Sequence, residues 1–183
     1  MIHFLQKIGN GKLILVAFIL TFIFGLGIFS SIEKEMNTTA ENPVQLLDLE
    51  LGYSHDFVTT SLDNMGEISR KIYQERFIPA DLVFPFVYGG FFIFIIAFLL
   101  KKTAKDKPKM IVLSLIPIAI IAFDYLENFN TLNILKTYPN HTISMVNYGS
   151  LMTKCKWGFI FISMLMVILL CILWAIKRMK TKS

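Results

Sequence analysis

Three long runs of uncharged residues constrain the fold of this chain more than any other feature of its sequence. Residues 13–32, 82–100 and 157–176 contain no Asp, Glu, Lys or Arg. A helix needs about 20 predominantly apolar residues to cross the hydrocarbon core of a bilayer, so each run predicts a transmembrane helix. Charged residues make up 17% of the chain, whereas soluble domains contain about 25%, so the composition excludes an ordinary soluble domain.

A fourth apolar run, residues 110–123, spans only about 21 Å as a helix at 1.5 Å per residue. It crosses a bilayer only if it continues to about residue 129, which places Asp124 and Glu127 at membrane depth. The sequence therefore predicts an all-α fold, a four-helix transmembrane bundle that forms a single domain over residues 1–183. The predicted spans are residues 13–32, 80–100, 110–129 and 154–176.

Basic residues border these spans on one side: Lys7 and Lys12, then Lys101, Lys102, Lys105, Lys107 and Lys109, then Lys177, Arg178, Lys180 and Lys182. Residues 33–80 instead hold nine acids against four bases. The positive-inside rule then predicts cytoplasmic termini and an outer segment between the first and second spans. We expect the plasma membrane, in particular a bacterial inner membrane. A cleaved signal peptide is the alternative interpretation of residues 1–31, but its apolar run is longer than the usual 7–15 residues.

The outer segment, about residues 43–78, is too long for a plain connection and is expected to form short helices. Ser54 is a good N-cap for a helix over residues 55–65 that ends at Gly66. Ile68, Ile72 and Tyr73 then repeat at helical spacing and predict an amphipathic helix over residues 67–77. This helix would lie on the bilayer surface or cover the end of the bundle.

Polar residues near the outer ends of the spans are the candidate site. Ionisable groups at membrane depth usually face a bundle interior or a water-filled cavity, paired with one another. Asp124, Glu127 and Asn128 share one helical face, and Pro85 frees the carbonyl of Asp81 as an acceptor. The predicted ligand-binding cluster is Asp81, Tyr88, Asp124, Glu127, Asn128 and Lys156.

A purely structural interpretation of the same residues stays open. Interfacial acids and lysines can extend to water, and a buried Asp–Lys pair can serve only to fix helix register. Paired carboxylates also suit general acid–base catalysis, but nothing in the sequence selects a reaction, so whether the chain is an enzyme is left open.

Other familiar signatures are absent from the sequence. There is no phosphate-binding loop, dinucleotide fingerprint, nucleophile elbow or Cys-x-x-Cys motif, so we expect no cofactor. The three histidines are scattered without a second ligand at metal spacing, so no metal site is predicted. The net charge of +5 reflects the predicted topology, and nucleic acid is not an expected partner.

The polar motifs resemble a widespread family of small, uncharacterised four-helix membrane proteins of bacteria. The resemblance covers about residues 43–176, through Leu47 to Tyr53, Asp81 with Phe84-Pro85 and Tyr88-Gly89, Asp124 with Glu127-Asn128, and Thr153 with Lys156-Trp157. It implies the four-helix architecture but no activity. A fainter similarity is to the EXPERA group of four-helix proteins, which implies acids around a lipid-facing pocket. The isomerases of that group also use a histidine, which the spans of this chain lack.

Three hypotheses for function follow. The first is a membrane protein whose outer polar pocket binds or modifies a small amphiphile or lipid-derived ligand. The second is a non-catalytic structural or accessory subunit that meets a partner membrane protein. The third is a small transporter, which would have to be a homodimer because four spans rarely form a pathway alone.

Overall fold

The computed structural model describes residues 1–40 and 42–180, and every regular element within them is helical. Glu41 and Lys182, which contribute to the charge argument, lie outside the described residues. The helices in chain order are α1 Ile2–Ile8, α2 Gly11–Phe22, η1 Ile23–Phe29, α3 Ser30–Thr39, η2 Leu47–Leu49, α4 His55–Ile72, η3 Tyr73–Phe77, α5 Ile78–Asp81, α6 Phe84–Thr103, η4 Pro108–Leu115, α7 Ile118–Thr137 and α8 Ile143–Lys180.

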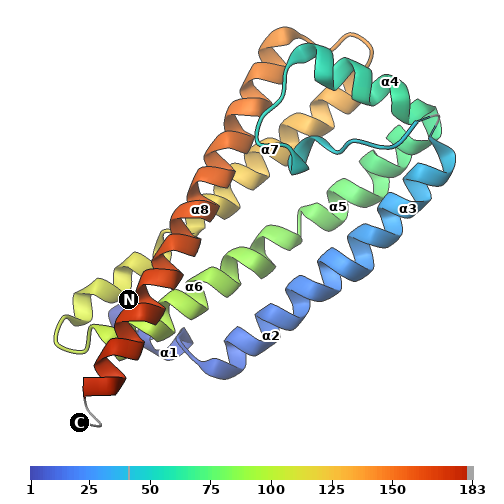
Figure 1. Ribbon diagram of the computed structural model, residues 1–183. Helices are drawn as coiled ribbons and strands as arrows, with labels where there is room; N and C mark the ends of the chain where they lie inside the picture. The colour runs from blue at the N-terminus through green and yellow to red at the C-terminus, as the bar shows by residue number, and fades with distance from the viewer. Residues whose placement is uncertain (41, 181–183) are drawn as a thin grey trace.

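Within the described residues, four helical stretches are long and apolar enough to cross a membrane, which confirms the predicted number. They are Gly11–Thr39, His55–Thr103, Pro108–Thr137 and Ile143–Lys180. Figure 1 shows α2 and α3 as one continuous rod beside α5 and α6, with α7 and α8 on the other side. The short apolar run at residues 110–123 belongs to such a stretch, which includes Asp124 and Glu127.

The helices extend beyond the predicted spans because charge limits what a bilayer accepts but does not end a helix. The first span was predicted to end at residue 32, yet α3 continues to Thr39. Ile32 and Met36 are buried in the core that α3 forms with α4, and Glu35 forms an ion pair with Arg76. Packing and pairing therefore sustain seven more helical residues in a polar sequence.

Residues 43–78 contain η2, α4 and η3, and α4, η3 and α5 follow one another without a loop between them. Ser54 caps α4 as its sequence position predicts, because its Oγ accepts a hydrogen bond from the backbone N–H of Phe57 at 3.2 Å. At Gly66 the backbone leaves helical geometry, with φ 68° and ψ 175°. Gly66 thus marks a kink between two helical segments, at the residue where the sequence predicts the first helix to end, and the chain is helical again immediately afterwards.

The break at Gly66 changes which side of the following helix is buried. Ser69, Tyr73 and Phe77 face the core at spacings of four residues, whereas Ile68 is 61% exposed. Ile68 therefore does not pack into this core. The Ser69 hydroxyl donates a hydrogen bond to the carbonyl of Met36 at 2.7 Å and tethers this helix to α3, which explains why the side with Ser69 is buried.

Two apolar cores occupy the two ends of the molecule. The first, which joins α3, α4 and α7, has at its centre Met36, Leu47, Val58, Leu62, Met65, Tyr73 and Ile134. The second, which joins α1, α6, η4 and α8, consists of Leu5, Ile96, Ala97, Leu99, Leu100, Ile111 and Leu170. Helix α4 lies across one end of the bundle, and α1 lies at the opposite end near η4 (Figure 1). The polar site lies between the two cores.

Candidate functional site

The junction between α5 and α6 places the first acid of the site. The helix is interrupted at Leu82 and Val83, and Pro85 stands in the first turn of α6, where it has no N–H to donate. The carbonyl of Asp81 accepts a hydrogen bond from Nδ2 of Asn128 at 3.2 Å, so the predicted free acceptor at Asp81 is confirmed. The Asp81 side chain is buried, with the whole residue only 5% exposed.

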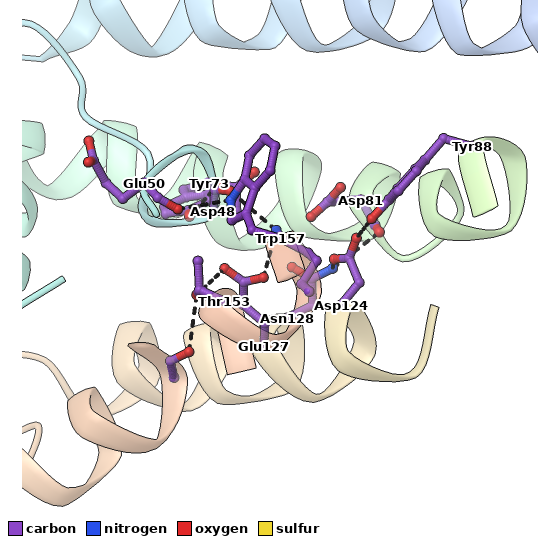
Figure 2. Close-up of polar contacts among 12 residues, drawn as sticks. Asp48, Glu50, Tyr73, Asp81, Tyr88, Asp124, Glu127, Asn128, Thr153 and Trp157 are labelled. Atoms are coloured by element: carbon purple, nitrogen blue, oxygen red, sulfur yellow. Dashed lines mark hydrogen bonds and ion pairs between the residues drawn. The ribbon is translucent and has the colours of Figure 1, made fainter. Parts of the chain in front are cut away.

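Helix α7 supplies the second acid. The Tyr88 hydroxyl, from α6, donates a hydrogen bond to Oδ2 of Asp124, and Nδ2 of Asn128 donates to Oδ1 at 3.1 Å. Asp124 and Asn128 are one helical turn apart, which lets one amide contact both Asp124 and the Asp81 carbonyl (Figure 2). Tyr88, Asp124, Asn128 and the carbonyl of Asp81 therefore meet in one hydrogen-bonded group.

The third acid, Glu127, is paired with the only base of the predicted cluster. Nζ of Lys156 lies 2.6 Å from Oε2 of Glu127, and the Thr153 hydroxyl donates to Oε1 at 2.6 Å. Both partners come from α8, one helical turn apart, and Glu127 is completely buried. Sequence reasoning expects Lys156 to neutralise one carboxylate of the cluster, and the structure assigns Glu127 to that role.

The loop before α4 adds residues that sequence reasoning missed. The carbonyl of Asp48 accepts from Nζ of Lys156 at 3.2 Å, and its Oδ1 accepts from the Tyr73 hydroxyl at 3.3 Å. Two residues on, the carbonyl of Glu50 accepts from the indole N–H of Trp157 at 3.0 Å (Figure 2). Burial raises the pKa of the Asp48 carboxyl above its usual range, and the charge of Lys156 opposes that rise.

The alternation Leu47-Asp48-Leu49-Glu50-Leu51 was the available signal for this segment. Its leucines are expected to pack against an apolar surface, which brings the acids between them close to the bundle. Only Leu47 of the three leucines is buried, and Leu49 and Leu51 are about 60% exposed. The alternation therefore marks a segment that contacts the bundle, but it does not indicate which helix the acid reaches.

A cavity of about 330 Å³ opens beside this cluster, bounded by α2, α6, α8 and the Asp48 loop. Its lining residues are Thr21, Asp48, Leu49, Asp81, Phe84, Tyr88, Phe91, Phe92, Asp124, Lys156, Trp157 and Ile160. Four of the six predicted site residues belong to this lining, and Glu127 and Asn128 do not. The volume falls within the range of about 300–1,000 Å³ found for small-molecule sites.

The polar cluster thus has two halves. We call Glu127, Thr153 and Lys156 the paired half, because Lys156 and Thr153 both contact the Glu127 carboxylate. We call Asp81, Tyr88 and Asp124 the open half, because they line the cavity and, among the described residues, form no ion pair; Lys156 of the paired half lines the cavity as well. Among the described lining residues, three are acids and Lys156 is the only base. Within residues 1–40 and 42–180, no group of three or more His, Cys, Asp or Glu side chains is placed to hold a metal ion.

No family model, curated protein or solved structure matches this chain.

Proposed function

We propose that this chain is an integral membrane protein whose cavity binds a small amphiphile or a lipid-derived ligand. The observation that carries the proposal is the lining of the cavity, which combines buried carboxylates with aromatic and aliphatic walls. Sites for small organic ligands are typically apolar with a few polar groups that fix orientation. An amphiphile matches this lining, with its head group at the acids and its chain along the apolar wall.

The polar residues favour a head group that donates hydrogen bonds. The Asp48, Asp81 and Asp124 carboxylates supply acceptor oxygens, and Lys156 is held by Glu127 at 2.6 Å. A carboxylate can accept several hydrogen bonds but donates none when it is ionised. Hydroxyl and amine head groups are therefore expected to bind better than carboxylate head groups of the same chain length.

The apolar walls favour a hydrocarbon chain of modest length. Phe84, Phe91 and Phe92 come from α6, and Ile160 faces them from α8. Burial of apolar surface contributes about 25 cal/mol per Å², so a chain that covers these rings supplies most of the binding free energy. Thr21 places the C-terminal end of α2 at the same cavity, which suggests access from the side of the bundle.

A structural role is the second candidate, and the paired half favours it. A buried ion pair with satisfied hydrogen bonds can fix the register of two helices without any ligand. Glu127 lies on α7 and Lys156 on α8, and the pair fixes the register between these two helices. Under this alternative the cavity is a packing gap, and the open half has no ligand to recognise.

The proposed function includes an orientation of the chain in the membrane. The basic residues after α6 and at the end of α8 favour a cytoplasmic position for that end of the bundle, so α4 and the cavity would lie toward the outer side. In a variant without Cys155 and Cys171, an impermeant thiol reagent added to intact cells should label a cysteine at Thr60 and spare one at Asp106. The reverse labelling pattern would contradict this orientation.

The two tryptophans allow a direct test of binding. Trp157 lines the cavity, whereas Trp174 packs against Phe98 at the other end of α8. The probe is 11-bromoundecanol, whose bromine quenches nearby indole fluorescence, added to the purified full chain in detergent. A Trp174→Phe variant, which keeps Trp157, should show quenching that saturates, and a Trp157→Phe variant should show only weak quenching that grows linearly.

The control is Asp81→Asn in the Trp174→Phe background, which removes a charged acceptor from the cavity. This change should abolish the saturable part of the quenching, because hydrogen bonds to an ionised carboxylate are stronger than those to the neutral amide oxygen that replaces it. Linear quenching of equal size at both tryptophans would favour the structural alternative.

A further inference from the structure

A second cavity, of about 600 Å³, lies at the opposite end of the molecule from α4 and far from the polar cluster along the bundle (Figure 1). It is formed where α1, the end of α6 and the start of η4 meet. Its lining residues are His3, Gln6, Lys7, Leu100, Lys101, Ala104, Lys105, Lys107, Pro108 and Ile111. Four of these residues are lysines and none is an acid.

Helix α1 is fixed in place as one wall of this cavity. Leu5 is buried in the core that contains Leu100 and Ile111, and Nζ of Lys101 donates to the carbonyls of Gln6 at 2.7 Å and Gly9 at 3.0 Å. A Cβ at Gly9 would lie within 3 Å of the backbone of α6, so glycine permits this close approach. The cavity is therefore built by tertiary packing rather than by a loose tail.

The remaining three lysines have no opposing charge. Among the described residues, no ion pair or hydrogen bond engages the ammonium groups of Lys7, Lys105 or Lys107. Asp106, the acid of the same loop, is absent from the lining of this cavity and forms no ion pair with a described residue, although it shares one neighbouring depression with Lys107 and another with Lys105. Three unpaired positive charges around one concave surface create a field that attracts a multiply charged anion.

Apolar residues next to the cavity indicate where this anion would come from. Phe4 of α1 is 63% exposed and Met110 of η4 is 37% exposed, although both belong to the end of the bundle that carries the lysines. Short amphipathic helices with exposed aromatic residues and lysines lie in the head-group region of a bilayer. The cavity then faces the level at which phospholipid phosphates lie.

We propose that this cavity binds the phosphate of an anionic ligand, with an anionic phospholipid head group as the favoured source. Lysine ammonium groups bind phosphate as point charges, and basic pockets between transmembrane helices are known sites for anionic head groups. Lys7 approaches the phosphate from α1, while Lys105 and Lys107 approach from the α6–η4 connection. The proposal is independent of the amphiphile site between α2, α6 and α8.

The test uses the purified full chain in detergent and follows its melting temperature. Phosphatidylglycerol added to the micelles should raise the melting temperature by several degrees more than phosphatidylcholine does, because a ligand that binds only the folded state stabilises it. In a Lys7→Gln/Lys105→Gln/Lys107→Gln variant, the difference between the two lipids should fall at least about twofold.

The matched control changes three exposed lysines far from this cavity, as Lys34→Gln/Lys71→Gln/Lys136→Gln. It alters net charge equally and should keep the full phosphatidylglycerol effect. If the triple cavity variant does not fold, Lys107→Gln alone replaces it and should show a partial loss.

Soluble glycerol phosphate, added in place of the lipid, distinguishes the two sources. A shift with glycerol phosphate but none with phosphatidylglycerol would retain the phosphate and reject the lipid. An equal phosphatidylglycerol effect in the cavity variant and the control variant would overturn the proposal.

Discussion

The two halves of the polar cluster use the same residue types with different partners. In the paired half, Glu127 receives both Lys156 and the Thr153 hydroxyl, and it is completely buried. In the open half, Asp81 and Asp124 are also buried but line a cavity of about 330 Å³. A carboxylate whose oxygens already contact a cation and a hydroxyl has few free acceptor positions for a ligand. A carboxylate that faces a cavity can still accept hydrogen bonds from one.

The two halves are therefore expected to differ in role, with the paired half important for stability and the open half for ligand binding. Removing one partner of a buried ion pair leaves an uncompensated charge, which is costly. Neutralising a carboxylate that forms no direct ion pair costs less, because burying the charge was itself unfavourable. We therefore expect variants of the paired half to unfold the protein and variants of the open half to change what it binds.

The largest effect is expected from Lys156→Met, which leaves Glu127 buried without its cation. The free energy of unfolding should fall by about 3–5 kcal/mol, and adding Glu127→Leu should restore much of it. Unfolding of the detergent-solubilised protein by increasing SDS measures both changes. Lys154→Met, at an exposed lysine of the same helix, is the control and should change stability by less than about 0.5 kcal/mol. Purely additive effects of the two substitutions would show that the pair does not interact.

A smaller loss is expected from Gly149→Ala, which tests how tightly the paired half is packed. The Thr153 hydroxyl also donates to the carbonyl of Gly149 at 3.0 Å. A Cβ at Gly149 would overlap the Tyr53 hydroxyl and the Asn130 amide, so the substitution should cost about 1–3 kcal/mol.

Gly158 is the matched control for this substitution on the same helix. No atom lies within 4 Å of a Cβ built there, so Gly158→Ala should stabilise the helix by about 0.5–1 kcal/mol. Equal melting temperatures for the two alanine variants would contradict the close packing at Gly149.

Asp81→Asn should have little effect on stability, in contrast to Glu127→Gln. The asparagine keeps the backbone carbonyl that Asn128 contacts and removes a buried charge, so the free energy of unfolding should change by less than about 1 kcal/mol. Glu127→Gln leaves Lys156 without its anionic partner and should cost more. SDS unfolding compares the two variants directly. A larger loss for Asp81→Asn would reverse the assignment of the halves.

The smallest effect concerns pH and Asp48. Because burial raises the pKa of its carboxyl in the folded state, ionising Asp48 opposes folding above that pKa. This cost fades as the pH falls toward the unfolded value of 3.8. The melting temperature of the wild type relative to Asp48→Asn should therefore rise as the pH is lowered from about 7 toward 3.8. A fall over the same interval would mean that the charged form is favoured.

The sequence was sufficient to predict the helices and the level at which the acids meet. Charge-free runs mark the apolar stretches, and Asp81, Asp124 and Lys156 all stand at the same end of their spans, so four antiparallel helices bring them together. The pairing was not predictable, because Asp124 and Glu127 lie on one face of α7 and only its rotation decides which acid meets Lys156. The role of Asp48 was hidden for a similar reason, since the alternation of leucines and acids around it does not indicate which helix the segment contacts.

Lipid mass spectrometry of the purified protein tests most directly whether the cavity holds an amphiphile. The wild type should retain an amphiphile with a hydroxyl or amine head group, at close to one molecule per chain. Asp81→Asn/Asp124→Asn should fold and lose this molecule, whereas Asp56→Asn/Asp106→Asn, which changes two exposed acids, should keep it. No retained amphiphile in the wild type, or equal amounts in both double variants, would contradict the proposed function.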